Sequence, residues 1–211
     1  MKRFLLVTGL MLGAIGAWLS LDPPAPRPAS ASSAQPPVAR TNAPGEGNCT
    51  GCHTGNALNT AGGSVAITDV PPNYVPGQTY TLTVTVQRPG QLRWGFEMTA
   101  LRSNGFAAGS FTNLTTFTGT QTFSGRLYIN HSRLNGADGT FPDDPSGAWQ
   151  INWTAPAAGA GTVTFYVAGN AADGLGSDQG DFIYTTTATS AEGAMTDVSA
   201  TTWGKIKMLY R

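Results

Sequence analysis

One short stretch of the chain has residue types and a spacing that could do chemistry. Cys49 and Cys52 stand three positions apart and His53 follows directly, in the order Cys-Thr-Gly-Cys-His. Two thiols at this spacing can form thioethers to the two vinyl groups of one porphyrin, and the adjacent imidazole can bind the iron from one face. The chain has no other cysteine. The pattern predicts one covalent haem c per chain, with Cys49 and Cys52 as attachment residues and His53 as the proximal iron ligand.

Other uses of the cysteine pair remain open. A disulfide between such close cysteines would restrict the unfolded chain very little. A redox-active dithiol normally begins a helix beside a βαβ pattern, and no such pattern follows Cys52. A zinc site needs four ligands, and the chain offers Cys49, Cys52, His53 and one further histidine, His131. Thiol–disulfide exchange is therefore the alternative chemistry for this motif.

The opposite face of the iron needs its own candidate ligand. His131 is the first candidate, because it is the one spare histidine, at the end of an expected strand. Met98 is a weaker alternative, because it shares the inward side of a strand with Trp94 and Phe96 and core packing explains it equally well. Two histidines would give a low-potential electron carrier, whereas an open position would allow peroxide or gas-ligand chemistry. The sequence shows no distal Arg/His pair of the kind that supports a peroxidase.

The N-terminus predicts export. Met1-Lys2-Arg3 is basic and residues 4–21 are almost wholly apolar, so residues 1–21 read as a signal peptide or, since the run is nearly long enough to cross a bilayer, a retained N-terminal anchor. Covalent haem attachment takes place after export, so motif and signal require the same compartment. We expect a periplasmic or cell-surface location in a bacterium, with a possible membrane tether.

Composition narrows the partner classes. The formal net charge is zero and 11% of the residues are charged, which excludes a basic nucleic-acid binder. The 27 glycines suit an extracellular β-domain with many turns. An electron carrier would need a redox partner protein, which charge does not identify.

The chain divides into segments by composition. Residues 22–44 are rich in Pro, Ala and Ser and predict an extended, solvated linker. Residues 45–63 form the haem-binding segment, with room for a helix of only a turn or two. Residues 64–190 form the main domain, and residues 191–211 a more basic tail of undecided role.

Alternation of apolar and polar residues dominates the main domain. It predicts strands around Val65–Ile67, Tyr80–Val86, Leu92–Ala100, Phe123–His131, Trp149–Trp153 and Val163–Val167. Clusters of Gly, Pro and Asn separate these runs, and no helical period appears among them. The fold class is therefore all-β, an immunoglobulin-like antiparallel β-sandwich preceded by the short haem-binding segment.

An acidic stretch near the end of the domain has a second possible use. Asn170, Asp173, Asp178 and Asp181 could line a calcium loop, although their spacing is not that of an EF-hand and such residues usually form turns.

Several motifs resemble those of the reelin-type (Reeler) domain family. They are Tyr74-Val75-Pro76-Gly77 followed by Tyr80, Trp94-Gly95-Phe96, Trp153-Thr154-Ala155-Pro156, and the run from Gly161 to Asn170. More specifically, residues 45–190 resemble bacterial exported proteins that carry a CxxCH segment before such a domain. The resemblance implies a β-sandwich outside the cell and no defined activity.

These observations favour an exported monohaem c-type cytochrome that transfers electrons and is more a carrier than a catalyst. A non-enzymatic surface or matrix interaction module, with the haem as an accessory, is the first alternative. A CxxC thiol–disulfide oxidoreductase is the second.

Overall fold

The computed structural model describes residues 32–194, so the expected signal or anchor and most of the tail lie outside the described residues. The described elements are a 3₁₀ turn η1 (Cys49–Gly51) and strands β1 (Ser64–Thr68), β2 (Asn73–Tyr74), β3 (Thr79–Gln87), β4 (Arg93–Arg102), β5 (Ser110–Asn113), β6 (Thr118–Phe123), β7 (Arg126–His131), β8 (Ser146–Thr154), β9 (Val163–Ala172) and β10 (Phe182–Glu192). Within residues 32–194, no helix has the length and apolar character needed to cross a membrane.

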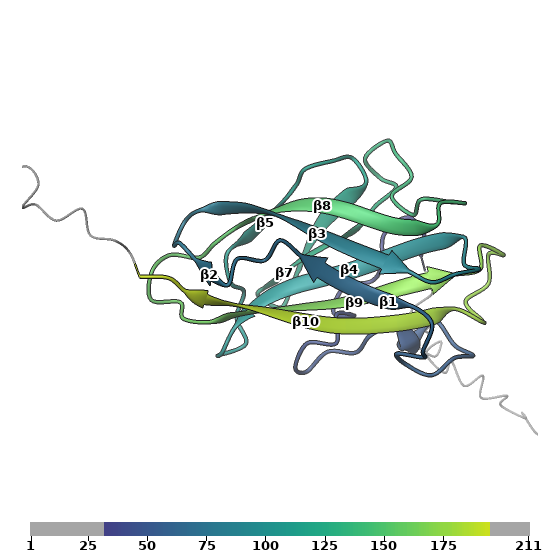
Figure 1. Cartoon of the computed structure of the whole chain (residues 1–211), viewed down its shortest axis with the longest axis horizontal. Coiled ribbons are helices and arrows are strands. Elements are labelled where there is room, and N and C mark those ends of the chain that lie inside the picture. Colours follow the sequence, from purple (N-terminus) through teal and green to yellow (C-terminus); the bar gives the residue numbers. More distant parts are fainter. Residues whose placement is uncertain (1–31, 195–211) are drawn as a thin grey trace, which may run out of the picture.

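The strands form two stacked sheets (Figure 1). One sheet has the order β1-β3-β8-β5, and the other has the order β2-β10-β9-β4-β7-β6. Neighbouring strands are antiparallel except for the short pairing of β2 with β10, which is parallel. The predicted all-β sandwich is therefore confirmed.

Large side chains on the facing sides of the two sheets make the core. β4 supplies Trp94, Phe96 and Met98, which are at most 1% exposed. The opposite sheet supplies Trp149 and Trp153 from β8, and the Phe96 and Trp149 ring centroids lie 4.5 Å apart. These aromatic contacts fix the spacing of the sheets, because each ring buries a large apolar area.

Each run predicted to be a strand corresponds to one, with one difference, whereas β2, β5 and β10 were not predicted. The alternation at Phe123–His131 predicted one strand, but β6 ends at Phe123 and β7 begins at Arg126. Ser124 and Gly125 between them have φ angles of 50° and 77°, as a tight hairpin turn requires. A Ser-Gly pair within an alternating run was the signal for this turn.

Residues 32–48, here called the covering segment, lie on the outer side of the six-stranded sheet (Figure 1). Side chains alternate between the two faces of a strand, yet every residue from Trp94 to Leu101 in β4 is buried. The outer face is therefore covered as well as the inner one. The expectation that residues 22–44 stay solvated is wrong for the part described: Thr41 and Ala43 are 0% and 2% exposed.

Polar groups hold the covering segment in place. The backbone N–H of Arg40 donates to Glu97 Oε2 at 2.6 Å. Glu46 accepts from Arg126 Nη1 at 2.5 Å and from the Tyr128 hydroxyl at 2.7 Å. A Pro/Ala/Ser-rich stretch has little apolar surface of its own to bury, so composition alone did not predict this packing, which depends on polar side chains that the sheet presents outward.

Candidate functional site

The Cys-Thr-Gly-Cys-His motif forms a single compact turn. Asn48 precedes η1 and its side-chain oxygen accepts from the Thr50 N–H at 2.9 Å, a short N-cap. The N–H groups of Cys52 and His53 both donate to the Cys49 carbonyl, at 3.2 and 2.9 Å. The turn thereby brings the two cysteines and the histidine together at one place.

The residues after the motif fix its orientation against the loop that precedes β10. Thr54 pairs with Gln179 in a parallel bridge, with the Thr54 N–H donating to the Asp178 carbonyl and the Gly180 N–H donating to the Thr54 carbonyl, both at 2.8 Å. Gly55 has a φ of 103°, and a Cβ there would lie 2.9 Å from the Gly180 nitrogen. Only glycine allows the two backbones to approach this closely.

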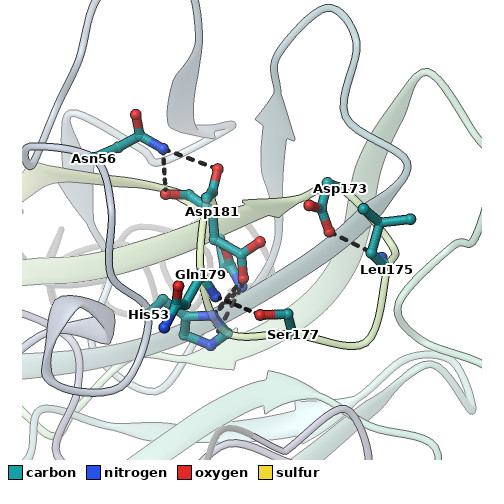
Figure 2. Close-up of polar contacts among 9 residues, drawn as sticks. His53, Asn56, Asp173, Leu175, Ser177, Gln179 and Asp181 are labelled. Atoms are coloured by element: carbon teal, nitrogen blue, oxygen red, sulfur yellow. Dashed lines mark hydrogen bonds and ion pairs between the residues drawn. The ribbon is translucent and has the colours of Figure 1, made fainter.

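His53 is held by a buried carboxylate. Its Nδ1 lies 2.5 Å from Asp181 Oδ2, and the Asp181 side chain is 0% exposed while that of His53 is 19% exposed. Figure 2 shows the His53 ring directed at Asp181. Asn56 donates through Nδ2 to the Asp181 backbone carbonyl at 3.1 Å, and Asn170 Nδ2 donates to Asp181 Oδ2 at 3.2 Å. A carboxylate can only accept, so the proton between Asp181 and His53 belongs on Nδ1. The amide nitrogen of Asn170 lies 3.1 Å from that Nδ1 and 3.3 Å from Nε2, which carries the lone pair of the ring.

A cavity of about 430 Å³ opens beside His53. Cys49, Cys52, His53 and His131 all line it, although His131 comes from the end of β7. Its volume lies within the range of about 300–1,000 Å³ that is typical of small-molecule and cofactor sites. Met98, the weaker ligand candidate, is 0% exposed within the hydrophobic core and does not line this cavity.

His131 is 6% exposed, and its ring lies beside Gly95, where a Cβ would come within 2.9 Å of the His131 Cε1. The Phe96 N–H donates to His131 Nδ1 at 3.1 Å, and the Phe96 carbonyl lies 3.3 Å from the same nitrogen. Burial lowers the pKa of His131 to about 4, against the opposing effect of the Phe96 and Ser32 backbone. The ring is therefore neutral near pH 7, the state in which an imidazole binds a metal ion.

Cys49 lies close to a second buried acid, Glu97. Desolvation raises the pKa of the Cys49 thiol to about 12, and the nearby Glu97 carboxylate adds to the rise. Glu97 itself is 0% exposed, and burial raises its pKa to about 8, partly offset by the hydrogen bond from the Arg40 N–H. This environment suppresses the thiolate of Cys49, whereas reactive cysteines have lowered pKa values.

The cavity wall carries charged groups of both signs, two arginines and two aspartates. Arg40 and Arg93 line it, and Arg93 is also 3.9 Å from Asp138. Three lining residues each keep one buried polar atom without a hydrogen-bond partner: Arg40 Nε, Asn170 Oδ1 and Asp181 Oδ1. Buried polar atoms rarely stay unpaired, so these atoms are candidates for contacts with a bound molecule or water.

Two aspartates of the acidic loop, Asp173 and Asp181, make hydrogen bonds to other protein groups. Asp181 contacts His53, and Asp173 Oδ1 accepts from the Leu175 N–H at 2.9 Å (Figure 2). Within residues 32–194, no three or more His, Cys, Asp or Glu side chains gather closely enough to hold a metal ion directly. The calcium and zinc alternatives therefore have no ready-made ligand set in this part of the chain.

The sequence did not identify Asp181 or Asn170 as partners of His53. Both were noted as residues of a possible calcium loop, but Asp181 is 128 positions from His53. The one available signal was their place in a Gly- and Asp-rich loop before the last strand.

Comparisons with known proteins give similar solved structures. No protein-family model matches the sequence, and a search of curated proteins finds no match. The Reeler domain of human F-spondin is 24% identical, with 67% of this chain and 95% of that chain covered and a TM-score of 0.44. A second structure, the Reelin-N domain of F-spondin, is 24% identical over 69% and 96% of the two chains, with a TM-score of 0.46. The sixth cohesin of scaffoldin B from Acetivibrio cellulolyticus is 14% identical over 59% and 98%, with a TM-score of 0.33.

The solved structures similar to this chain thus include Reeler domains of F-spondin. At these identities and TM-scores the comparisons assign neither a family nor an activity, so membership of the Reeler family stays a prediction from the sequence motifs.

Proposed function

We propose that the protein is an exported monohaem c-type cytochrome that carries electrons through a haem attached to Cys49 and Cys52. The observation that carries this proposal is the cavity of about 430 Å³, which both cysteines, His53 and His131 line together. When bound, haem would supply a one-electron redox couple.

The residues present fit a covalently held haem. Asp181 places the His53 proton on Nδ1, so Nε2 would be the ligand once it exchanges its 3.3 Å contact with Asn170 Nδ2 for the iron. His131 is a neutral imidazole on the same cavity. Arg40 and Arg93 are suitably charged to pair with the two haem propionates, because a guanidinium binds carboxylates through paired hydrogen bonds. Cys49 and Cys52 would hold the porphyrin edge through thioethers.

The thiol–disulfide alternative is disfavoured by the state of Cys49. A dithiol enzyme needs a stabilised thiolate, but burial and Glu97 raise the pKa of this thiol to about 12. A thioether has no such requirement, because the sulfur carries no charge once it is alkylated.

One observation favours a second candidate function, binding of a small ligand at an open iron position. If Nδ1 of His131 accepts from the Phe96 N–H, as the 3.1 Å distance allows, the ring proton is on Nε2 and that nitrogen cannot bind iron. If Nδ1 instead donates to the Phe96 carbonyl at 3.3 Å, Nε2 carries the lone pair that could bind iron. Arg40 and Arg93 line the same cavity as His131, a proximity between arginine and histidine that the sequence did not reveal.

The proposed function is tested by maturation and spectroscopy. The full chain is expressed with cytochrome c maturation machinery, and a pyridine haemochrome spectrum measures covalent haem. We expect one haem per chain, and none in Cys49→Ser/Cys52→Ser protein, which serves as the matched control. Absence of covalent haem from the parent would refute the proposal.

The same sample separates the two candidate functions. A six-coordinate spectrum that resists carbon monoxide and changes in His131→Ala supports electron transfer with His131 as a ligand. Rapid carbon monoxide binding by the reduced parent supports the open position instead.

A further inference from the structure

The buried contact between Asp181 and His53 would affect the bound haem in a way that the proposed function does not include. A surface histidine ligand can take water as the partner of its second nitrogen, but here a side chain that is 0% exposed occupies that place at 2.5 Å. The contact joins residues 128 positions apart, so it is a product of the fold rather than of the local turn.

The surroundings of Asp181 make its carboxylate a strong acceptor. Its side chain is removed from water and Oδ1 has no hydrogen-bond partner. Asn170 Nδ2 also donates to Oδ2 at 3.2 Å and so competes with His53, whose Nδ1 and Nε2 lie 3.1 and 3.3 Å from the same amide nitrogen. Hydrogen bonds to carboxylates gain strength when the pair is removed from water. An acceptor on Nδ1 also increases the basicity of the other ring nitrogen, the one left to bind a metal ion.

We propose that Asp181 is a positioning residue that keeps the His53 proton on Nδ1 and, by increasing the electron density on Nε2, lowers the reduction potential of the bound haem. This inference rests on the proposed function, since it needs His53 to be the iron ligand. A more basic imidazole stabilises the ferric state over the ferrous state, so a stronger acceptor on Nδ1 means a lower potential. The protein would therefore exchange electrons with partners of low potential.

The test compares three variants of the matured full chain by spectroelectrochemical titration. Asp181→Asn keeps the shape of the side chain but removes the charged acceptor. We expect the equilibrium constant for haem reduction to rise by about tenfold, which is about 59 mV for a one-electron couple. Asn170→Ala removes the competing donor to Asp181 and should leave the potential equal to or below that of the parent.

Asp178→Asn is the matched control. Asp178 lies in the same loop and lines the same cavity, but it is exposed and Asp181, not Asp178, contacts His53. It removes the same charge, so its smaller shift measures the general electrostatic effect alone. A shift in Asp178→Asn as large as that in Asp181→Asn would overturn the inference.

Two further outcomes are distinguishable. An unchanged potential in haem-loaded Asp181→Asn would overturn the inference and leave the proposed function intact, whereas a parent without covalent haem would overturn both. Nitrogen-15 NMR of the full chain, expressed without maturation, provides a readout that needs no haem. We expect the proton of His53 on Nδ1 in the parent and a mixture of tautomers in Asp181→Asn, and a mixture in the parent would refute the positioning role.

Discussion

Replacement of Glu97 by Gln tests how the covering segment is held on the sheet. Glu97 lies on the outer face of β4, is 0% exposed, and accepts from the Arg40 N–H at 2.6 Å through Oε2, while Oε1 has no partner. Glutamine has nearly the same shape and keeps an oxygen for the Arg40 N–H. The substitution therefore removes the ionisable group with little change in packing.

The sign of the effect follows from the direction of the pKa shift. Burial raises the pKa of Glu97 from 4.5 to about 8, so between these pH values the unfolded chain loses a proton that the folded protein keeps. The stability contribution of this group is complete below pH 4.5 and is lost as the pH rises towards 8. A shift of this size corresponds to on the order of 5 kcal/mol in the free energy of unfolding.

Glutamine should therefore flatten the pH dependence. At pH 5 the variant should be less stable by about 1 kcal/mol, because the glutamine NH2 group that takes the place of Oε1 has no acceptor there. At pH 8.5 it should be more stable than the parent by about 2–3 kcal/mol, since it never has to hold a buried charge. The two curves of stability against pH should cross.

Urea unfolding of the chain expressed without maturation, followed by tryptophan fluorescence at pH 5, 6.5 and 8.5, measures this effect. Asp144→Asn, which removes an exposed carboxylate, is the control and should follow the parent. Parallel curves for Glu97→Gln and the parent would show that the Glu97 carboxyl group is solvated in the folded protein and that the covering segment does not bury it.

Two further predictions concern the covering segment and the cavity wall. Glu46→Ala removes the acceptor of Arg126 and Tyr128, so we expect the free energy of unfolding to fall by about 2–4 kcal/mol. Limited proteolysis should then cut the covering segment, before Cys49, faster than in the parent. Digestion at the parent rate would contradict this. Gly95→Ala places a Cβ 2.9 Å from the His131 ring, so it should move that ring and change the absorption spectrum of the matured protein with little change in haem content. A spectrum identical to that of the parent would show that the His131 ring is not at the haem.

The strands were predictable wherever one face is apolar and the other polar. The runs that became β3 and β8 alternate almost perfectly, because they lie in the sheet whose outer face is open to water. β10 was not predicted, since its Thr-rich centre lacks a clear apolar period. The parallel pairing with β2 could not be read from a two-residue strand.

The candidate site was predictable only in its local part. The motif from Cys49 to His53 is contiguous, so the haem attachment proposed for it could be inferred from residue type and spacing. Asp181 and Glu97 act across 128 and 57 positions, and only the folded chain brings them to His53 and Arg40. An acid that faces outward on a strand reads as solvated, and no local pattern shows that another segment will cover it.

The positions of His53 and His131 would give a bound haem a mechanical role. His53 belongs to the segment that precedes the sandwich and His131 to the end of β7, and both line one cavity. A haem bound to the first through covalent attachment and to the second through iron would tie the two together as a cross-link. Closing a loop of about 80 residues in this way would stabilise the fold by about 4.5 kcal/mol through the lost entropy of the unfolded chain. A change in the oxidation state of the iron, or loss of its bond to His131, would then change how stably the N-terminal segment is attached to the sandwich. The redox state of the haem and the stability of the fold would therefore be linked.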